Sequence, residues 1–127
     1  MNNKPVLISY LGLLAFHVAH VFEEVWGGFR VMRTLGTGWF LAANWALFLA
    51  PLFFFYLLLT GRRTGYLLCI AYGAVMVLNG IGHNLGTIIS GSYPGDFAGA
   101  YAGLGLIIFG AAVVYYLRQS MKDNSHA

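Results

Sequence analysis

The chain has 127 residues, of which 59% are hydrophobic and only 9% are charged. Soluble domains carry about 25% charged residues, and a chain this short has too little interior to hide so much apolar surface from water. The composition therefore excludes an ordinary soluble domain and predicts an integral membrane protein. The net charge of +3 comes from basic residues at the ends of apolar runs, so we expect no nucleic-acid partner.

Four segments are long and apolar enough to cross a bilayer as helices, which takes about 20 residues each. In chain order they are Val6–Trp26, Trp39–Leu59, Gly65–Ile89 and Phe97–Leu117. Between them we expect a glycine-rich loop, a tight turn and a Pro-Gly loop, at Gly27–Gly38, Thr60–Thr64 and Ser90–Asp96. Asp96 is placed to cap the last helix. We predict an all-α, polytopic membrane four-helix bundle in which residues 1–127 form one domain.

The distribution of basic residues predicts the orientation of this bundle. Four spans place both termini and the second connection on one side of the membrane. That side holds most of the Lys and Arg residues, namely Lys4, Arg62, Arg63, Arg118 and Lys122, against Arg30 and Arg33 on the other. The positive-inside rule then predicts a multi-pass protein of the cell membrane with both termini in the cytoplasm.

Small residues suggest how the last two spans pack. Gly82 and Gly86 form one small-xxx-small pair, and Gly99 and Gly103 form another. Such pairs let two helix backbones approach closely in lipid. We therefore expect the third and fourth spans to pack tightly against each other.

The first span ends in polar residues that are unusual for a membrane helix. At about 100° per residue, His17, His20 and Glu24 fall within roughly 60° of one another on one helix face, with Glu23 beside them. Ionisable groups inside a bilayer are costly, so they face the bundle interior and pair with one another. This face is the first candidate for a functional site.

Polar residues of the next two spans are expected at the same depth. Asn79 and His83, four residues apart, share one face of the third span with Thr87, and Asn44 is the single amide of the second span. At 1.5 Å per residue, His20, Asn44 and His83 all lie roughly 8–9 Å below the same, non-cytoplasmic surface. The first three spans should therefore share one polar site.

A structural role is the alternative for each of these residues. His20 and Glu24 could form a buried pair that fixes helix register, and Glu23 could reach the headgroups. Asn44 and Asn79 could hydrogen-bond neighbouring helices. Register needs only one or two polar groups, so the whole set favours a functional site.

The order of these residues resembles a known family. His20-Val21-Phe22-Glu23-Glu24 reads H-x-x-E-E; Asn44, then Asn79, His83 and Thr87, and then Tyr93-Pro94-Gly95 follow. This order resembles the HXXEE family of small bacterial four-helix membrane proteins. The resemblance implies the four-span topology and a shared site, and it adds Tyr93 to the candidate residues. It implies no particular reaction.

The first functional hypothesis is an enzyme whose catalytic residues are His20, Glu23, Glu24 and His83. Glu24 and His20 would act as an acid/base pair that Glu23 tunes, and His83 would be the opposing acid or a ligand. A substrate oxygen would be oriented by Asn44, Asn79, Thr87 and Tyr93. The expected substrate is an apolar small molecule with one polar group, such as an isoprenoid, a sterol-like molecule or a fatty acyl chain. Isomerase, hydrolase and cyclase chemistry all fit.

A metal-assisted variant of the enzyme fits the same residues. His17, His20, Glu24 and His83 would supply three imidazoles and one carboxylate to a divalent metal, zinc or iron. Helical pairs at i,i+3 and i,i+4 are common metal ligands in bundles.

Two other function classes remain open from the sequence. One is a non-enzymatic binder or transporter of protons, a metal ion or a lipid, because intramembrane His and Glu also form proton relays. The other is a structural membrane subunit. Membrane lipid is a partner in every case, and a homo-oligomer would be needed for a pore.

Overall fold

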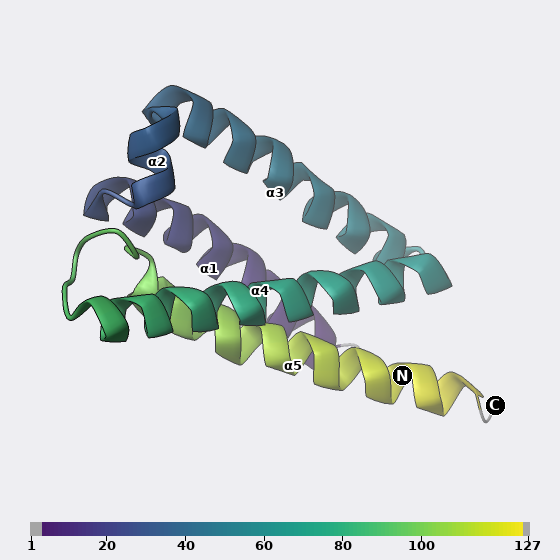
Figure 1. The fold of residues 1–127 in the computed structure, drawn as a ribbon. Coiled ribbons are helices and arrows are strands. Elements are labelled where there is room, and N and C mark those ends of the chain that lie inside the picture. The colour runs from purple at the N-terminus through teal and green to yellow at the C-terminus, as the bar shows by residue number, and fades with distance from the viewer. Residues whose placement is uncertain (1–3, 126–127) are drawn as a thin grey trace.

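The structure is a computed structural model that describes residues 4–125 (Figure 1). Five helices follow one another, namely α1 (Lys4–Gly27), α2 (Arg30–Leu35), α3 (Thr37–Leu59), α4 (Arg63–Ser90) and α5 (Ala100–Ser125). The four long helices are long and apolar enough to cross a membrane. This confirms the predicted all-α fold with four candidate spans.

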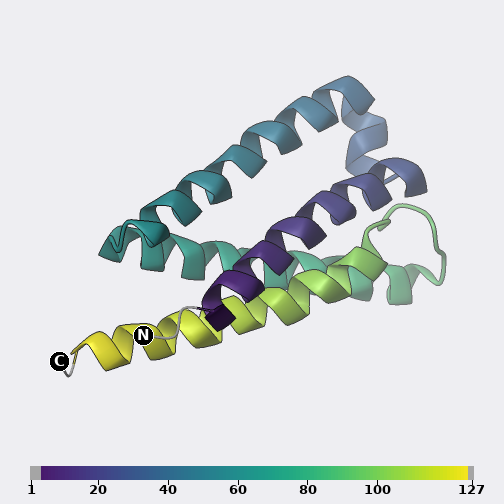
Figure 2. The ribbon, with the colours of Figure 1, turned by 180° about the vertical axis from the view of Figure 1, so that it is seen from behind.

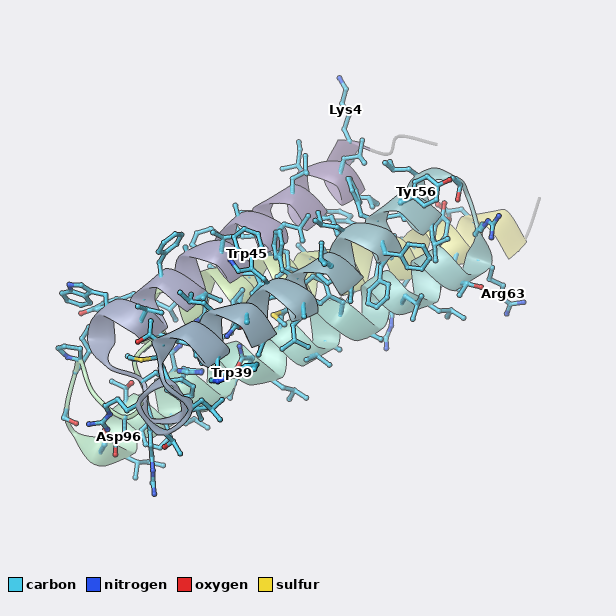
Figure 3. All side chains as sticks on the ribbon, turned by 90° about the horizontal axis from the view of Figure 1, so that it is seen from above. Lys4, Trp39, Trp45, Tyr56, Arg63 and Asp96 are labelled. Carbon is cyan, nitrogen blue, oxygen red and sulfur yellow. The ribbon has the colours of Figure 1, made fainter. Side chains whose placement is uncertain are left out.

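The long helices run alternately up and down the bundle, so two ends can be distinguished. The start of α1, the α3–α4 turn and the end of α5 lie at one end, and α2 and the α4–α5 connection lie at the other (Figures 1 and 2). In Figure 3, Lys4 and Arg63 lie toward the first end, and Trp39 and Asp96 lie toward the second. The second end carries the polar site and is called the α2 end below.

The predicted loop at Gly27–Gly38 is wrong, because it contains a short helix. Gly28 and Gly36 have φ angles of +74° and +82°, a region that favours glycine, and these two residues break the chain on either side of α2. The segment between them closes as a helix that buries Met32. The glycines therefore act as helix boundaries and not as the residues of an open loop.

The tight packing expected between the last two spans is present, and α4 and α5 form the most extensive helix pair. Two glycine contacts bring their backbones together. A side chain at Gly80 would overlap the Gly103 carbonyl oxygen, and a Cβ at Gly110 would lie 2.7 Å from the Gly73 carbonyl oxygen. Seven residues separate the two glycines on each helix, so both contacts lie on one stripe of each helix.

One of the two predicted glycine pairs is wrong. A Cβ on Gly82 would meet nothing within 4 Å, so this residue faces away from the helix interface. Its expected partner, Gly86, packs against the Phe97 ring. The α4 glycines that contact α5 are instead Gly73 and Gly80. Spacing alone could not distinguish them, because glycine also occurs on lipid-facing surfaces.

Helix α3 diverges from the rest of the bundle. Most of the buried core comes from α1, α4 and α5 and includes Tyr10, Cys69 and Leu106, while α3 contributes Leu58 near its end. Helix α3 contacts α4 closely near the turn that joins them, where a side chain at Gly65 would overlap the Leu57 backbone. From that turn α3 leans away, and α2 bridges the wide end of the wedge (Figures 1 and 2). A cleft of about 650 Å³ lies among α1, α3 and α4.

Candidate functional site

Three ionisable side chains from two helices meet near the α2 end. His20 and Glu24 lie one turn apart on α1, and His83 comes from α4. The Nε2 atoms of His20 and His83 lie 3.4 and 3.3 Å from Glu24 Oε1. All three residues are buried, with exposed fractions of 2%, 6% and 7% for His20, Glu24 and His83. They are called the His-Glu-His cluster below.

Two backbone carbonyls fix the orientation of both imidazole rings. His20 Nδ1 lies 3.0 Å from the Gly99 oxygen, and His83 Nδ1 lies 3.2 Å from the Phe97 oxygen. A carbonyl can only accept a hydrogen bond, so both Nδ1 atoms carry a proton. When the rings are neutral, each Nε2 therefore presents a lone pair toward Glu24.

Gly99 is a required part of this arrangement, although the sequence pattern did not single it out as a site residue. Its φ of +117° favours glycine, and it lies in the connection that leads into α5. A Cβ there would lie 2.9 Å from the Nδ1 atoms of both His20 and His83. Glycine therefore allows the backbone to reach the two rings.

Asn79 joins the His-Glu-His cluster as predicted from its helix face. Its Nδ2 lies 3.2 Å from His20 Nε2, so the amide donates to the lone pair of that nitrogen. Thr87 lies next to the cluster, and its hydroxyl donates to the Phe97 carbonyl at 3.3 Å, the same oxygen that holds His83. The structure thus gives Thr87 a contact that orients the loop. Its expected contact with a substrate stays a prediction.

Asn44 is separate from the cluster. Its amide donates to the Phe40 carbonyl of its own helix at 2.9 Å, and its side chain lines the space between α1 and α3. The equal depth of Asn44 and His20 therefore does not bring them into contact, because α3 leans away from α1. A role in orienting a substrate would require a ligand that extends across the cleft.

His17 also lies outside the cluster, although it shares a helix face with His20. Its Nδ1 is hydrogen-bonded to the Tyr72 hydroxyl at 2.8 Å, and its ring packs on Phe48. Within residues 4–125, the group that could hold a metal consists of His20, Glu24 and His83. The four-ligand set expected from the sequence is thus reduced to three, and Tyr72 is a partner that spacing did not identify.

Glu23 faces the start of α5 and does not join the His-Glu-His cluster, although Glu24 beside it does. Its carboxylate accepts hydrogen bonds from the Tyr93 hydroxyl, from Tyr101 N at 2.9 Å and from Ala102 N at 2.6 Å. These two N–H groups belong to the first turn of α5, which has no partner for them within the helix. Burial, and then this hydrogen bond to Glu23, raises the pKa of Tyr93.

The expected cap at Asp96 is therefore wrong. Its carboxylate pairs with Arg33 of α2, and its carbonyl accepts from Arg30 N at 3.4 Å. Helix α5 begins at Ala100 and not at Phe97, which puts Asp96 too far from the first free N–H groups. Glu23 from α1 occupies the capping position instead.

Helix α2 and the residue before it cover the site. The Phe29 ring lies 4.9 Å from the His83 ring, centroid to centroid, and it also contacts Phe40 of α3. The pairing of Arg33 with Asp96 ties α2 to the α4–α5 connection. A six-residue helix within a glycine-rich stretch gave no periodic signal, so the sequence did not reveal this cover.

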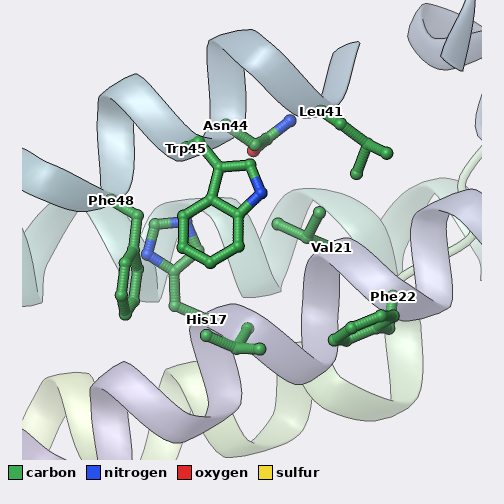
Figure 4. Close-up of a pocket in the computed structure, with 8 residues that line it drawn as sticks. His17, Val21, Phe22, Leu41, Asn44, Trp45 and Phe48 are labelled. Atoms are coloured by element: carbon green, nitrogen blue, oxygen red, sulfur yellow. The ribbon is translucent and has the colours of Figure 1, made fainter. Parts of the chain in front are cut away.

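The cleft brings the cluster into contact with an apolar space. Its wall includes His20, Glu24 and Asn79, and farther along it His17 and Tyr72. Most other lining residues are apolar, among them Phe40, Leu47, Pro51, Phe54, Leu68, Val75 and Met76. A smaller pocket of about 70 Å³ lies along the α1–α3 seam, where Trp45 and Phe48 extend from α3 toward α1 (Figure 4).

Comparison with known proteins adds no relative, because no family model, curated protein or solved structure matches the chain. The resemblance to the HXXEE family stays a prediction. The function must therefore be argued from the geometry of the site.

Proposed function

We propose that this chain is an integral membrane enzyme that acts on a lipid-like substrate at the His-Glu-His cluster. One observation carries this proposal: two members of the cluster, His20 and Glu24, line an apolar cleft of about 650 Å³ among three candidate spans. Pockets that hold small molecules are mostly apolar, with a few polar groups that fix orientation. The cleft has that composition, and its volume is within the usual range of about 300–1,000 Å³.

The polar groups divide into those that reach the cleft and those that hold them in place. Glu24 and His20 lie on the cleft wall and would exchange a proton with the substrate. His83 contacts Glu24 and would hold it. The Asn79 amide, which is on the same wall, would orient a substrate oxygen. Glu23 would support the site by tying α1 to α5, through the bonds described above.

The lining also indicates the class of substrate. A molecule in the cleft would lie against the aliphatic and aromatic side chains of α3 and α4, with its polar group at Glu24 and His20. An isoprenoid, a sterol-like molecule or a fatty acyl chain with one oxygen function has this character. Proton transfer at that oxygen or at an adjacent carbon supports isomerisation, hydrolysis or cyclisation.

The location of the site follows from the charges at the two ends. We infer that the end that carries Lys4, Arg62 and Arg63 faces the cytoplasm of the cell membrane, because basic residues accumulate on that side. The α2 end, and the cluster with it, then lies in the outer half of the bilayer. A substrate would enter from the lipid and not from the cytoplasm.

The test compares lipid conversion by the wild-type chain and by Glu24→Gln. Each protein is reconstituted into vesicles made from a total bacterial lipid extract, and the lipids are analysed by chromatography and mass spectrometry over time. Gly82→Ala is the matched control, because a Cβ at that position meets nothing within 4 Å. We expect wild type and Gly82→Ala to produce a new lipid species that Glu24→Gln does not form.

Two outcomes would contradict the enzyme. Identical lipid profiles for wild type and Glu24→Gln would exclude catalysis by the cluster. A lipid that co-purifies with wild type, leaves the protein with its mass unchanged and is absent from Glu24→Gln would instead support a binder. Ala71→Phe, which places a ring in the cleft wall, should reduce conversion without altering the cluster.

A further inference from the structure

The distances within the His-Glu-His cluster are unusual for an ion pair. Hydrogen bonds between a charged nitrogen and a carboxylate are about 2.7–2.9 Å long. Here the two Nε2–Oε1 distances are 3.4 and 3.3 Å, although all three side chains are buried. The third distance, between the two Nε2 atoms, is at most 4.8 Å. The three atoms thus surround a common point without forming good hydrogen bonds to each other.

This spacing matches the edge of a metal coordination sphere. Zinc binds His nitrogen and carboxylate oxygen at about 2.0–2.2 Å, which gives a ligand–ligand distance of about 3.3–3.6 Å in a tetrahedron. An octahedral ion with bonds of about 2.1 Å would bring neighbouring ligands to about 3.0 Å. The observed distances between Glu24 and the two histidines fit the tetrahedral arrangement.

The tautomers of the two histidines support the same conclusion. The Gly99 and Phe97 carbonyls hold the proton of each ring on Nδ1, so the neutral rings of His20 and His83 direct lone pairs toward the Glu24 carboxylate. Metal-binding histidines usually donate their other N–H to a carbonyl or a carboxylate in this way. Two lone pairs and a carboxylate repel one another unless a proton or a metal ion lies between them, and distances of 3.3–3.4 Å favour the metal ion over a shared proton.

We propose that His20 Nε2, Glu24 and His83 Nε2 bind one Zn²⁺ ion whose fourth position opens into the cleft. Two imidazoles and one carboxylate with an open position form a known type of catalytic zinc site. Such an ion would polarise a substrate oxygen or activate a water molecule. With the ion bound, His20 and Glu24 would be its ligands, and a water on the ion would exchange the proton with the substrate in their place. This chemical purpose rests on the proposed function, although ion binding can be measured alone.

Asn79 gives this metal site a distinctive property. Its amide donates to His20 Nε2 at 3.2 Å and thus uses the lone pair that a metal would need. Asn79 lies on the cleft wall, where its side chain can turn into open space. Removal of the amide should therefore leave Zn²⁺ binding intact or strengthen it, whereas removal of a ligand, as in Glu24→Gln, should abolish it.

The test measures zinc by elemental analysis after the purified chain is loaded with Zn²⁺ in detergent and freed of excess ion. Wild type, Asn79→Ala, Glu23→Gln and His17→Gln should each retain about one Zn²⁺ per chain. Glu24→Gln and His83→Asn should each lose at least nine-tenths of it. His83→Asn retains a donor at the Nδ1 position for the Phe97 carbonyl, so helicity by circular dichroism should stay at the wild-type value.

Cobalt provides a readout that does not depend on the variants. Wild type loaded with Co²⁺ should show the intense visible absorption of a tetrahedral ion. No visible absorption, or the weak bands of an octahedral ion, would overturn the proposed site, as would equal zinc content in wild type and Glu24→Gln. Zinc bound without any lipid conversion would refute the enzyme alone, and lipid conversion by a metal-free chain would refute the catalytic role of the ion alone.

Discussion

Gly99→Ala is expected to damage the site more than any other single glycine substitution in the α4–α5 connection. The alanine Cβ would lie 2.9 Å from the Nδ1 atoms of His20 and His83, so both rings must move. The φ of +117° adds a backbone cost of about 1–2 kcal/mol for any L-residue. Displacement of His20 from the Gly99 carbonyl adds about 0.5–1.5 kcal/mol. We expect a total loss of about 1.5–3.5 kcal/mol in the free energy of unfolding.

Two glycines supply matched controls for the two parts of this cost. Gly91 has a φ of +65° but open space around its Cβ position, so Gly91→Ala carries the backbone cost alone. Gly82 lies in a helix with nothing within 4 Å, so Gly82→Ala carries neither cost. Unfolding in mixed detergent micelles, followed by circular dichroism, should rank Gly82→Ala as the most stable, then Gly91→Ala, then Gly99→Ala.

Zinc affinity separates damage to the site from general instability. Loss of a group that orients a metal ligand lowers metal affinity by about 10–100-fold. We therefore expect Gly99→Ala to lower Zn²⁺ affinity by at least that factor and Gly91→Ala to leave it unchanged. If Gly99→Ala bound zinc like wild type, or if Gly91→Ala weakened zinc binding equally, the close approach of Gly99 would not be what positions the rings of His20 and His83.

Three further predictions concern the supports of the site. Glu23→Gln should lower the free energy of unfolding, measured in mixed micelles, by about 1–2 kcal/mol. The neutral amide cannot accept both N–H bonds from α5, and it places no negative charge at the N-terminus of that helix. An unchanged value would refute the role of Glu23 in anchoring α5. Tyr93 has a raised pKa, so its hydrogen bond stabilises the fold fully below pH ~10 and less as the pH rises above that value. The stability difference between wild type and Tyr93→Phe, measured in an unfolding series across pH, should therefore be constant below pH ~10 and shrink above it; growth above pH ~10 would contradict the assignment. Gly80→Ala should destabilise the chain by about 1–3 kcal/mol, since its Cβ would overlap the Gly103 carbonyl, whereas Gly82→Ala, two residues away, should not; equal stability of the two variants would refute the close approach of α4 and α5.

The meeting of His20, Glu24 and His83 could be predicted from helical geometry. An i,i+4 pair shares one face, and equal depth on two helices that run in the same direction, as α1 and α4 do, places two groups at one level. Both rules depend on local backbone geometry, which a membrane helix cannot vary much. The positions of the four spans follow from length and apolar composition for the same reason.

The separation of Asn44 and His17 from the cluster could not be predicted. A membrane helix is apolar on all sides, since lipid solvates Leu as well as a neighbouring helix does. The pattern therefore does not show which face of α3 packs, or that α3 leans away from α1. That lean leaves Asn44 bonded to its own helix, and it leaves His17 free to bond Tyr72.

The role of Glu23 depends on where α5 begins. Sequence composition placed the start at Phe97, but the positive φ of Gly99 delays it to Ala100. Only this later start puts two free N–H groups opposite Glu23 and leaves Asp96 to Arg33. A shift of three residues thus decides which carboxylate caps the helix, and helix ends are the least certain feature of a sequence pattern.

A last prediction distinguishes a functional cluster from one that only holds the fold together. Buried charged groups are costly, and their replacement as a set by neutral residues is often neutral or stabilising. In the triple variant His20→Asn, Glu24→Leu and His83→Asn, each asparagine keeps a donor for the carbonyl of Gly99 or Phe97, while the three inward-facing ligand atoms are removed.

If the cluster serves chemistry, the metal-free triple variant should unfold within ~1 kcal/mol of metal-free wild type, because removing the buried ionisable groups offsets the lost contacts of His20 with Asn79 and of His83 with Phe29. A loss of ~3–5 kcal/mol would show that the His-Glu-His contacts themselves stabilise the bundle. The comparison must be made without zinc, because a bound ion stabilises the folded state by mass action. A cluster that costs stability when empty and faces an apolar cleft is better explained by the chemistry it can perform than by the structure it supports.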